Sequence, residues 1–455
     1  MTYPEATAFI WALTDYERRT GYDYSASRFD LGRVAVLLSR LGEPQSGMAL
    51  AHVAGTKGKG STSAMLASIF SRTGRRIGLY TSPHLHTVRE RIQVNGQPLR
   101  REEFSAAVAL VAEAMESGAG ITSFEALTAA AFVAFSRADV EVAVIEVGLG
   151  GRLDATNVIN PFVSIITSLS LDHTAVLGPT LEEIAAEKAG IIKPGVPVVS
   201  ACQQAGAARV LAERATRLEC ELEVAGLDWR YTCGPWGDNW QEFSLDGTSR
   251  DNAAGSATYR LPLLGVHQVE NATLALAAAR RAPAALGLRH EHMVEGLARV
   301  SWPGRFEVVR RAPYLVLDGA HNGDSMAKLC AALARHTGGG ERLLVFGASR
   351  DKDASAMLAP MVGEGTRLFL CQSGHGRSAV SEDVAAAALA AGLPHRSFGS
   401  VAEALWSSLD EASERDCVCV TGSLFVVAEA REAIARRCGV VDESEGEAEV
   451  LSLVR

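Results

Sequence analysis

The chain has 455 residues, of which 47% are hydrophobic and 21% are charged, and its formal net charge is −9. This length is sufficient for two or three domains that each bury a core, and the composition is that of a soluble globular protein. The negative charge gives no electrostatic basis for binding nucleic acid or an anionic membrane, so neither is expected as a partner.

The eight cysteines are scattered along the chain, and none forms a Cys-x-x-Cys pair. In a chain of this size, such a distribution predicts reduced structural thiols and not a disulfide framework or a zinc site. The first residues lack the basic and then apolar pattern of a signal peptide. No run approaches the roughly 18 apolar residues that a membrane-spanning helix needs. We therefore expect a cytoplasmic protein.

Residues 1–48 are predicted to be mainly helical, with helices at 3–18 and 31–41 and a polar loop at 25–30. From residue 49 onwards, strands alternate with helices. Strands are predicted at 49–54, 76–80, 140–147 and 162–167, and the last two are the near-continuous apolar runs typical of buried parallel strands. Helices are expected at 61–70, 101–116, 124–137 and 181–189, and a hairpin at 92–99 that turns at Asn95-Gly96. This alternation is typical of a doubly wound α/β sheet.

Residues 220–260 are polar and contain tryptophan and glycine without a helical period, so a few antiparallel strands and loops are expected there. A helix at 269–281 follows, and the loop around Trp302-Pro303-Gly304-Arg305 marks a domain boundary. A second α/β alternation has strands predicted at 314–317, 342–346, 367–371 and 418–421, and helices at 324–335, 354–362, 382–391, 401–409 and 424–437. The fold class is therefore α/β with two open domains, an N-terminal domain at 1–303 and a C-terminal domain at 304–440. The acidic stretch 441–455 is expected to be a flexible tail.

A glycine-rich turn joins the strand at 49–54 to the helix at 61–70. It contains Gly55, Thr56, Gly58, Lys59, Gly60 and Ser61. Glycines let backbone N–H groups converge on phosphate oxygens, while the helix N-terminus and a lysine add positive charge. The spacing departs from the usual phosphate loop, because Val53 stands where the first glycine is expected and Gly60 displaces the hydroxyl to Ser61. A glycine-rich turn without a ligand is the alternative, but strand, loop, lysine and helix together favour nucleotide binding.

Polar side chains follow three of the predicted parallel strands, at the edge of the sheet where open α/β folds bind ligands. These are Ser82, Glu146 and His173. A hydroxyl, a carboxylate and an imidazole form an acceptable ligand set for Mg²⁺ or Mn²⁺ when ATP oxygens and water complete the coordination. Singly, a serine before a proline is usually part of a turn, and a histidine is usually a hydrogen-bonded structural residue. Beside a phosphate loop, the combination favours a metal site.

Lys188 lies at the end of the helix at 181–189, where a lysine ordinarily stabilises the helix dipole. In the second domain, Arg305 follows a turn, and Asp318 and His321 follow a strand. The simpler interpretation is that these are ordinary connections. In the functional interpretation, the three residues reach nucleotide phosphate and ribose from a second domain that closes over the first.

Together these stretches resemble the folylpolyglutamate synthase/dihydrofolate synthase family of the Mur ligase superfamily, and their order is that of the family. The resemblance extends from about residue 29 to residue 428. It is carried by the segments 52–61, 81–85, 146–157, 171–173, 187–191, 265–272, 302–307, 318–322 and 346–353.

The resemblance implies a P-loop ATPase-type Mur ligase central domain followed by a Rossmann-like glutamate-ligase domain. It implies an ATP-dependent ligase that acts as a monomer on small molecules. ATP would phosphorylate the carboxylate of 7,8-dihydropteroate, of a folylpolyglutamate, or of both. The amino group of L-glutamate would then attack the acyl phosphate, and ADP and phosphate would be released. Because phosphate leaves more readily than hydroxide, catalysis would consist mainly of positioning and charge neutralisation.

The resemblance also assigns roles to residues. Lys59 and the backbone of 58–61 would hold the ATP phosphates, while Asn271, Arg305 and Asp318 would contact the nucleotide. His321 would lie near the transferred phosphate. Lys188 corresponds to a carbamylated lysine, whose carbamate would support a second magnesium ion beside the one held by Ser82, Glu146 and His173. The pterin substrate would contact Thr122, Ser123, Phe124, Glu125, Leu153, Asp154 and Ala155.

Two positions depart from the family pattern. Lys57 replaces the commoner asparagine and adds a cation whose partner the sequence does not identify, and Gly323 stands where proline is frequent. Two other hypotheses are a related ligase that acts on a cell-wall precursor and a nucleotide-binding regulatory protein that has lost catalysis. The run 148–157 and the Leu-Asp-His motif at 171–173 favour the folate branch over the first. The joint presence of Lys59, Glu146, His173, Lys188 and Asp318 argues against the second.

Overall fold

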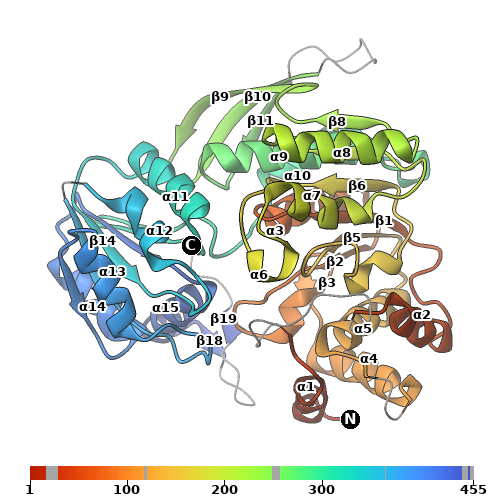
Figure 1. Cartoon of the computed structure of the whole chain (residues 1–455), viewed down its shortest axis with the longest axis horizontal. Helices are drawn as coiled ribbons and strands as arrows, with labels where there is room; N and C mark the ends of the chain where they lie inside the picture. Colours follow the sequence, from red (N-terminus) through yellow and green to blue (C-terminus); the bar gives the residue numbers. More distant parts are fainter. Residues whose placement is uncertain (17–28, 117–119, 248–256, 364, 443–448, 451–455) are drawn as a thin grey trace.

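The computed structural model describes residues 1–16, 29–116, 120–247, 257–363, 365–442 and 449–450. Figure 1 shows two α/β domains side by side, as predicted. The N-terminal domain contains an eight-stranded sheet of order β4-β3-β2-β5-β1-β6-β7-β8, in which β3 and β4 form the predicted hairpin and the other strands are parallel. Its strands are β1 Ala49–Ala54, β2 Ile77–Tyr80, β3 Ile92–Val94, β4 Gln97–Pro98, β5 Val142–Glu146, β6 Val163–Ile166, β7 Val198–Ser200 and β8 Leu222–Val224.

Helices cover both faces of this sheet, because successive side chains of a strand point to opposite faces. In β1, Leu50 packs with the cluster on one face and Val53 with the cluster on the other. The first face is covered by α1 Tyr3–Ala12, α2 Leu31–Arg40, α4 Arg101–Ala114 and α5 Ser123–Arg137. The second is covered by α3 Lys59–Phe70, α9 Val266–Ala279 and α10 His290–Ala298. Two further helices, α7 Leu181–Lys188 and α8 Ala205–Arg217, pack beside β6 and β7, and α6 Thr174–Leu177 precedes them.

The segment predicted to hold antiparallel strands forms a separate three-stranded sheet of order β11-β10-β9. Its strands are β9 Trp229–Gly237, β10 Trp240–Gly247 and β11 Ala257–Leu261, and they are antiparallel as expected. One part of the prediction is wrong, since β8 pairs in parallel with β7 and extends the main sheet. Buried side chains such as Phe243 pack this small sheet against the core that contains α9.

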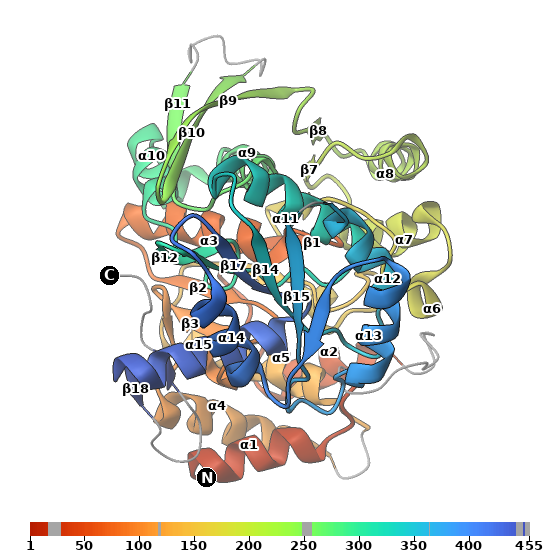
Figure 2. The same ribbon diagram turned by 90° about the vertical axis from the view of Figure 1, so that its left-hand side faces the viewer.

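The C-terminal domain contains a six-stranded sheet of order β12-β13-β17-β14-β15-β16. Its strands are β12 Glu307–Arg311, β13 Tyr314–Leu317, β14 Arg342–Phe346, β15 Thr366–Leu370, β16 His395–Ser397 and β17 Cys417–Thr421. Its helices are α11 Gly323–His336, α12 Ala354–Leu358, α13 Ser381–Ala390, α14 Val401–Glu411 and α15 Leu424–Cys438. Figure 2 shows the sheet between α11–α13 on one side and α14 and α15 on the other, and two separate buried clusters correspond to these two faces.

The ends of the chain differ from expectation. The first helix ends at Ala12 and not at residue 18, because Leu13 adopts an extended backbone and Thr14 forms a bridge with Thr122. Residues 17–28, which include most of the predicted polar loop, lie outside the described residues. In the stretch expected to be a flexible tail, β18 Val441–Asp442 pairs with β19 Glu449–Val450, and the rest lies outside the described residues.

Two predictions about composition can be compared with the structure. The structure has all eight cysteines as free thiols, and the reduced state remains a prediction. Within the described residues, every helix is too short or too polar to span a membrane.

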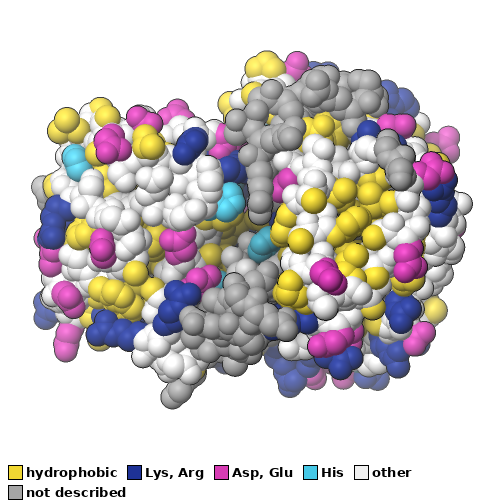
Figure 3. All heavy atoms as spheres, turned by 90° about the horizontal axis from the view of Figure 1, so that it is seen from below, with side chains coloured by type: hydrophobic (Ala, Val, Ile, Leu, Met, Phe, Trp, Pro, Cys, Tyr) yellow, Lys and Arg dark blue, Asp and Glu magenta, His cyan; other side chains and the backbone are white. Residues whose placement is uncertain are grey.

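Figure 3 shows the two domains separated by a hollow in which histidine side chains are visible.

Candidate active site

A cavity of about 640 Å³ lies between the two domains. From the N-terminal domain it is lined by the glycine-rich turn and by the residues that follow β2, β5 and β6. From the C-terminal domain it is lined by the residues that follow β13, β14 and β17. Carboxyl ends of parallel strands therefore contribute to both walls, and this is where open α/β sheets bind ligands.

The glycine-rich turn leads from β1 into α3 and directs the start of that helix at the cavity. Backbone N–H groups of Thr56 and Lys57 donate to the Ser168 carbonyl at 3.0 and 3.1 Å, which fixes the turn against the end of β6. Gly58, with φ of 90°, precedes the first residue of α3. The first intrahelical bond runs from Thr62 N to Gly58 O at 2.9 Å, so the preceding N–H groups have no intrahelical acceptor. The turn thus has the features of an anion-binding site.

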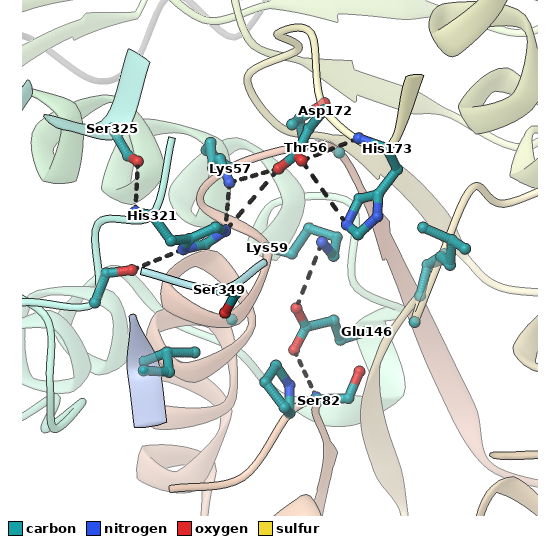
Figure 4. A pocket seen from close by; sticks show the side chains of 18 of the residues that line it. Thr56, Lys57, Lys59, Ser82, Glu146, Asp172, His173, His321, Ser325 and Ser349 are labelled. Carbon is teal, nitrogen blue, oxygen red and sulfur yellow. Dashed lines mark hydrogen bonds and ion pairs between the residues drawn. The ribbon is translucent and has the colours of Figure 1, made fainter. Parts of the chain in front are cut away.

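Lys59, Glu146 and Ser82 lie together on the N-terminal wall (Figure 4). Lys59 Nζ is 4.0 Å from Glu146 Oε1, and the backbone N–H of Ser82 donates to Glu146 Oε2 at 3.1 Å. Glu146 is 3% exposed. Burial raises its pKa to about 7, although the charge of Lys59 opposes this shift. A buried carboxylate without a hydrogen-bonded cation is well suited to take up a metal ion.

His173, the third predicted metal ligand, reaches the same cavity from another direction. It has φ of 51°, and its side chain is 40% exposed. In the view of Figure 4, Lys59 lies between the His173 ring and Glu146. Among the described residues, no three His, Cys, Asp or Glu side chains are close enough to form a metal cluster. The donor set fits a magnesium ion only if oxygens of a bound nucleotide or of water complete it.

Lys188, at the end of α7, is 4% exposed and lines the cavity. Burial, followed by the charges of Lys59 and Lys57, lowers its pKa to about 7. Within the described residues its ammonium group has no ion-pair or hydrogen-bond partner. The chain therefore holds at this position a largely desolvated amine that loses its proton near pH 7.

From the C-terminal domain, Asp318 and His321 follow β13 and enter the cavity. The carboxylate of Asp318 accepts hydrogen bonds from Phe306 N at 2.8 Å and Ala320 N at 2.9 Å, which fixes its orientation. Arg305 lines the same wall and donates to the Gly304 carbonyl at 3.1 Å. On the opposite wall, Asn271 donates to Gln268 Oε1 at 3.0 Å. All four residues predicted to approach a nucleotide thus border one cavity.

A chain of polar contacts crosses from one domain to the other. Lys57 Nζ donates to Asp172 Oδ2 at 2.8 Å and to His321 Nε2 at 2.6 Å. Lys352 Nζ donates to Asp172 Oδ1 at 2.6 Å. His321 Nδ1 lies 2.7 Å from the Gly319 carbonyl, so Nδ1 carries the proton and Nε2 accepts from the lysine. Burial alone would raise the pKa of Asp172, but the charges of Lys57, His173 and Lys352 hold it below its ordinary value.

The seven residues predicted to contact a pterin also border the cavity. Two of their carboxylates already have partners. Glu125 accepts from Thr122 N at 2.7 Å in the capping box that begins α5, and it pairs with Arg33 at 3.2 Å. Asp154 accepts from Leu149 N and Thr156 N, both at 3.0 Å. These two carboxylates therefore hold the backbone of the cavity wall in place, and they also border the cavity.

Comparison with known proteins places the chain in a family. Residues 53–279 match the Mur ligase middle domain, and residues 304–424 match the Mur ligase glutamate ligase domain. The chain belongs to the Mur ligase family. A dihydrofolate synthase/folylpolyglutamate synthase of Bacillus subtilis is 33% identical over 89% of this Mur ligase and 94% of that protein. The structure of E. coli FolC in complex with DHPP and ADP superposes with a TM-score of 0.84 at 31% identity, covering 96% of this chain and 99% of the other.

The archaeal relatives are longer. A protein of Halobacterium salinarum named as a probable bifunctional folylpolyglutamate synthase/dihydropteroate synthase is 38% identical over 97% of this Mur ligase. The chain spans 53% of that protein and 51% of the Haloferax volcanii relative, which is about half of their length.

Sequence reasoning missed two residues of this Mur ligase's site, Asp172 and Lys352. Both lie within segments that carry the family resemblance, 171–173 and 346–353, but neither received a role. Asp172 precedes a predicted metal ligand, and that position alone gave no indication of its partners. The unexplained charge of Lys57 could have pointed to Asp172, because a lysine in such a loop needs an anion nearby.

Proposed function

We propose that this Mur ligase is an ATP-dependent acid–amino-acid ligase (EC 6.3.2 type) that adds L-glutamate to a folate carboxylate. The acceptor would be 7,8-dihydropteroate, a folylpolyglutamate or both, and the reaction would pass through an acyl phosphate and release ADP and phosphate. The observation that carries the proposal is that the phosphate-loop lysine Lys59 and the glutamate-ligase residue His321 border one cavity. The likeness to a structure that holds both DHPP and ADP supports it, because that likeness extends over 96% of the chain.

The residues have the charges and positions that the reaction needs. In the first step, an oxygen of the folate carboxylate bonds to the γ-phosphorus of ATP and the bond to the ADP oxygen breaks. Lys59 and the N–H groups that begin α3 would neutralise the transferred charge, while Asn271, Arg305 and Asp318 orient the nucleotide. In the second step, the amino group of glutamate attacks the acyl carbon, a proton leaves the nitrogen, and phosphate departs. The neutral ring of His321 would stand near the phosphoryl group.

The metal part of the proposal is that Ser82, Glu146 and His173 hold a magnesium ion. It is supported by Glu146, whose buried carboxylate meets Lys59 at 4.0 Å and has no hydrogen-bonded cation among its described contacts. Bound magnesium would supply neutralisation of phosphate charge. The protein itself fixes the position of the Glu146 carboxylate, because the backbone N–H of Ser82 donates a hydrogen bond to it at 3.1 Å.

We also propose that Lys188 is carbamylated and that its carbamate supports a second magnesium ion. Carbamylation requires a neutral amine, and the pKa of Lys188, lowered to about 7 by burial and nearby cations, makes that form available at neutral pH. A carbamate would turn a buried cation without a described partner into an anionic ligand. Electron density at Lys188 in crystals grown with bicarbonate tests this proposal, and an unmodified amine distant from the metal ions would refute it.

The folate substrate would lie against Thr122, Ser123, Phe124, Glu125, Leu153, Asp154 and Ala155, which border the cavity opposite the C-terminal domain. A Mur-type ligase of a cell-wall precursor is the alternative, and it is less favoured because the relatives described above carry folate names. The proposal includes a domain boundary between residues 303 and 304, supported by the start of the glutamate ligase match at residue 304. It also includes action as a monomer in the cytoplasm on small-molecule substrates, and the free cysteines accord with a reducing compartment.

Phosphate release with ATP, Mg²⁺ and L-glutamate tests the function, with 7,8-dihydropteroate and tetrahydrofolate compared as acceptors. Turnover with both acceptors indicates a bifunctional enzyme. Turnover with tetrahydrofolate alone indicates a polyglutamylation enzyme and removes the pterin role of 122–125 in dihydropteroate binding. Turnover with neither acceptor refutes the proposal and favours the cell-wall alternative.

A further inference from the structure

Asp172 lies where the two domains meet, and its carboxylate is shared by one lysine from each. Oδ2 accepts from Lys57 of the phosphate loop at 2.8 Å, and Oδ1 accepts from Lys352 of the C-terminal domain at 2.6 Å. The three side chains are 7%, 13% and 10% exposed, respectively. Hydrogen bonds between charged groups that are shielded from water are considerably stronger than surface ion pairs.

The same bridge reaches a residue that faces the transferred phosphate in the proposed reaction. Lys57 also donates to His321 Nε2 at 2.6 Å, and the other ring nitrogen of His321 is held by the Gly319 carbonyl at 2.7 Å. Asn322, which caps α11, donates to Asp172 Oδ2 at 3.4 Å. The orientation of the His321 ring is therefore tied to the phosphate loop of the other domain (Figure 4).

One other contact between the domains lies near the turn, where Lys328 of α11 donates to Ser168 Oγ at 3.3 Å. Two further contacts lie away from the turn. His86 pairs with Glu432 of α15 at 3.1 Å. Arg311 of β12 lies 3.7 Å from Asp238, whose side chain is 75% exposed, in the turn between β9 and β10. Neither contact involves the glycine-rich turn or His321. The bridge through Asp172 differs from both because it joins the phosphate loop to the strand end carrying His321.

We propose that Asp172 is a positioning residue that, through Lys57 and Lys352, holds the C-terminal domain over the phosphate loop and sets the place of His321 for phosphoryl transfer. The inference rests on the proposed function for its catalytic part, whereas the closure of the domains does not depend on it. A fixed interdomain geometry is required for the reaction because reacting groups from two domains must meet at near-contact distance. The bridge also accounts for the cation that Lys57 adds to the loop.

Lys352→Met provides the test, because it removes the link without altering the phosphate loop. The variant is expected to lower kcat roughly tenfold to a hundredfold, as for loss of a hydrogen bond between charged groups, and to leave KM for ATP within about twofold. Small-angle X-ray scattering of the ligand-free protein should detect an increased radius of gyration. In the Asp172→Asn background, Lys352→Met should add little, because the two changes break the same bridge. Lys352→Arg should restore part of kcat.

Arg311→Gln is the matched control, since it removes a cation that lies near the exposed carboxylate of Asp238 in the β9–β10 turn and should leave kcat and the radius unchanged. An unchanged kcat in Lys352→Met overturns the positioning role, even if the radius increases. A raised KM for glutamate with normal kcat also overturns it, because Lys352 would then bind substrate. A lowered kcat that is additive with Asp172→Asn, without expansion, refutes the bridge. If the wild-type protein fails to ligate glutamate while the variant still expands, the proposed function fails and the interdomain bridge stands.

Discussion

Replacing Gly58 by alanine tests whether the turn before α3 is built to hold phosphate. Gly58 has φ of 90°, and a Cβ atom there would lie 2.3 Å from Asn271 Oδ1, whereas ordinary contacts begin at 3.4 Å. Asn271 Oδ1 would have to move by 3.4 − 2.3 Å, or about 1 Å, and we expect this displacement to break the hydrogen bond that Asn271 donates to Gln268 Oε1 at 3.0 Å. The left-handed backbone adds strain of about 1–2 kcal/mol for a residue with a side chain, and the hydrogen bond is worth about 1 kcal/mol.

Gly74→Ala separates the two effects. Gly74 has φ of 78°, but nothing lies within 4 Å of the place that an alanine Cβ atom would take, and the residue does not line the cavity. Urea denaturation should therefore show a loss of about 1–2 kcal/mol in Gly74→Ala from backbone strain, and about 2–3 kcal/mol in Gly58→Ala because the lost hydrogen bond adds to it. Titration calorimetry should show normal ADP binding in Gly74→Ala and a loss of roughly tenfold or more in Gly58→Ala, since binding through several N–H groups depends on their convergence.

The reasoning would be refuted if Gly58→Ala bound ADP with the affinity of the wild-type protein. Equal stability losses in the two variants would show that Asn271 yields without penalty, in which case the close approach is not a constraint. A crystal structure of Gly58→Ala that retained the Asn271–Gln268 hydrogen bond would lead to the same conclusion.

Three further predictions concern the cavity. Lys59→Ala, Glu146→Ala and His173→Ala should each abolish glutamate-dependent phosphate release while retaining the circular dichroism of the wild type; full activity in any of them would remove its assigned role. Lys188→Ala should be impaired and partly restored by short carboxylic acids, whereas activity unchanged by the substitution would argue against the carbamate. For pH, burial raises the pKa of Glu146 from 4.5 to about 7, so the native state holds this proton more tightly than the unfolded chain. Protonated Glu146 therefore stabilises the native state relative to the unfolded chain. This contribution is complete below pH 4.5 and is lost as pH rises through 7, and it amounts to about 3 kcal/mol at most. In metal-free protein, Glu146→Gln should therefore flatten the fall in unfolding free energy between about pH 5 and 8, and an unchanged slope would contradict the burial argument.

Two of the buried strands could be predicted because they carry their own signal. The runs at 140–147 and 162–167 contain β5 and β6, which are covered on both faces and are therefore apolar throughout. Edge strands carry a weaker apolar signal. Strand β16, for example, consists of His395, Arg396 and Ser397, and it was not predicted. Its pairing depends on β15 being already in place, which is a tertiary effect.

The candidate site divides in the same way. Ser82 and Glu146 could be brought together from the sequence because adjacent parallel strands end at one edge. The contacts of Asp172 could not be predicted, because Lys57 and Lys352 are 115 and 180 residues away in the sequence. Lys352 also belongs to the other domain. How two domains face each other depends on side-chain packing across a loop, which no periodicity in the sequence encodes.

The charges in the cavity explain how an anionic chain could accommodate the proposed nucleotide. The net charge is −9, yet the cavity gathers Lys57, Lys59, Lys188, Arg305 and Lys352. Two of these cations are bonded to Asp172 and are thereby directed at the domain interface. Lys59 lies 4.0 Å from Glu146, beyond hydrogen-bonding distance, and therefore remains incompletely neutralised. Because like charges repel in a site shielded from water, an anion that enters relieves this repulsion. The proposed affinity for phosphate therefore rests on Lys59, which remains available for an anion because Lys57 is paired with Asp172.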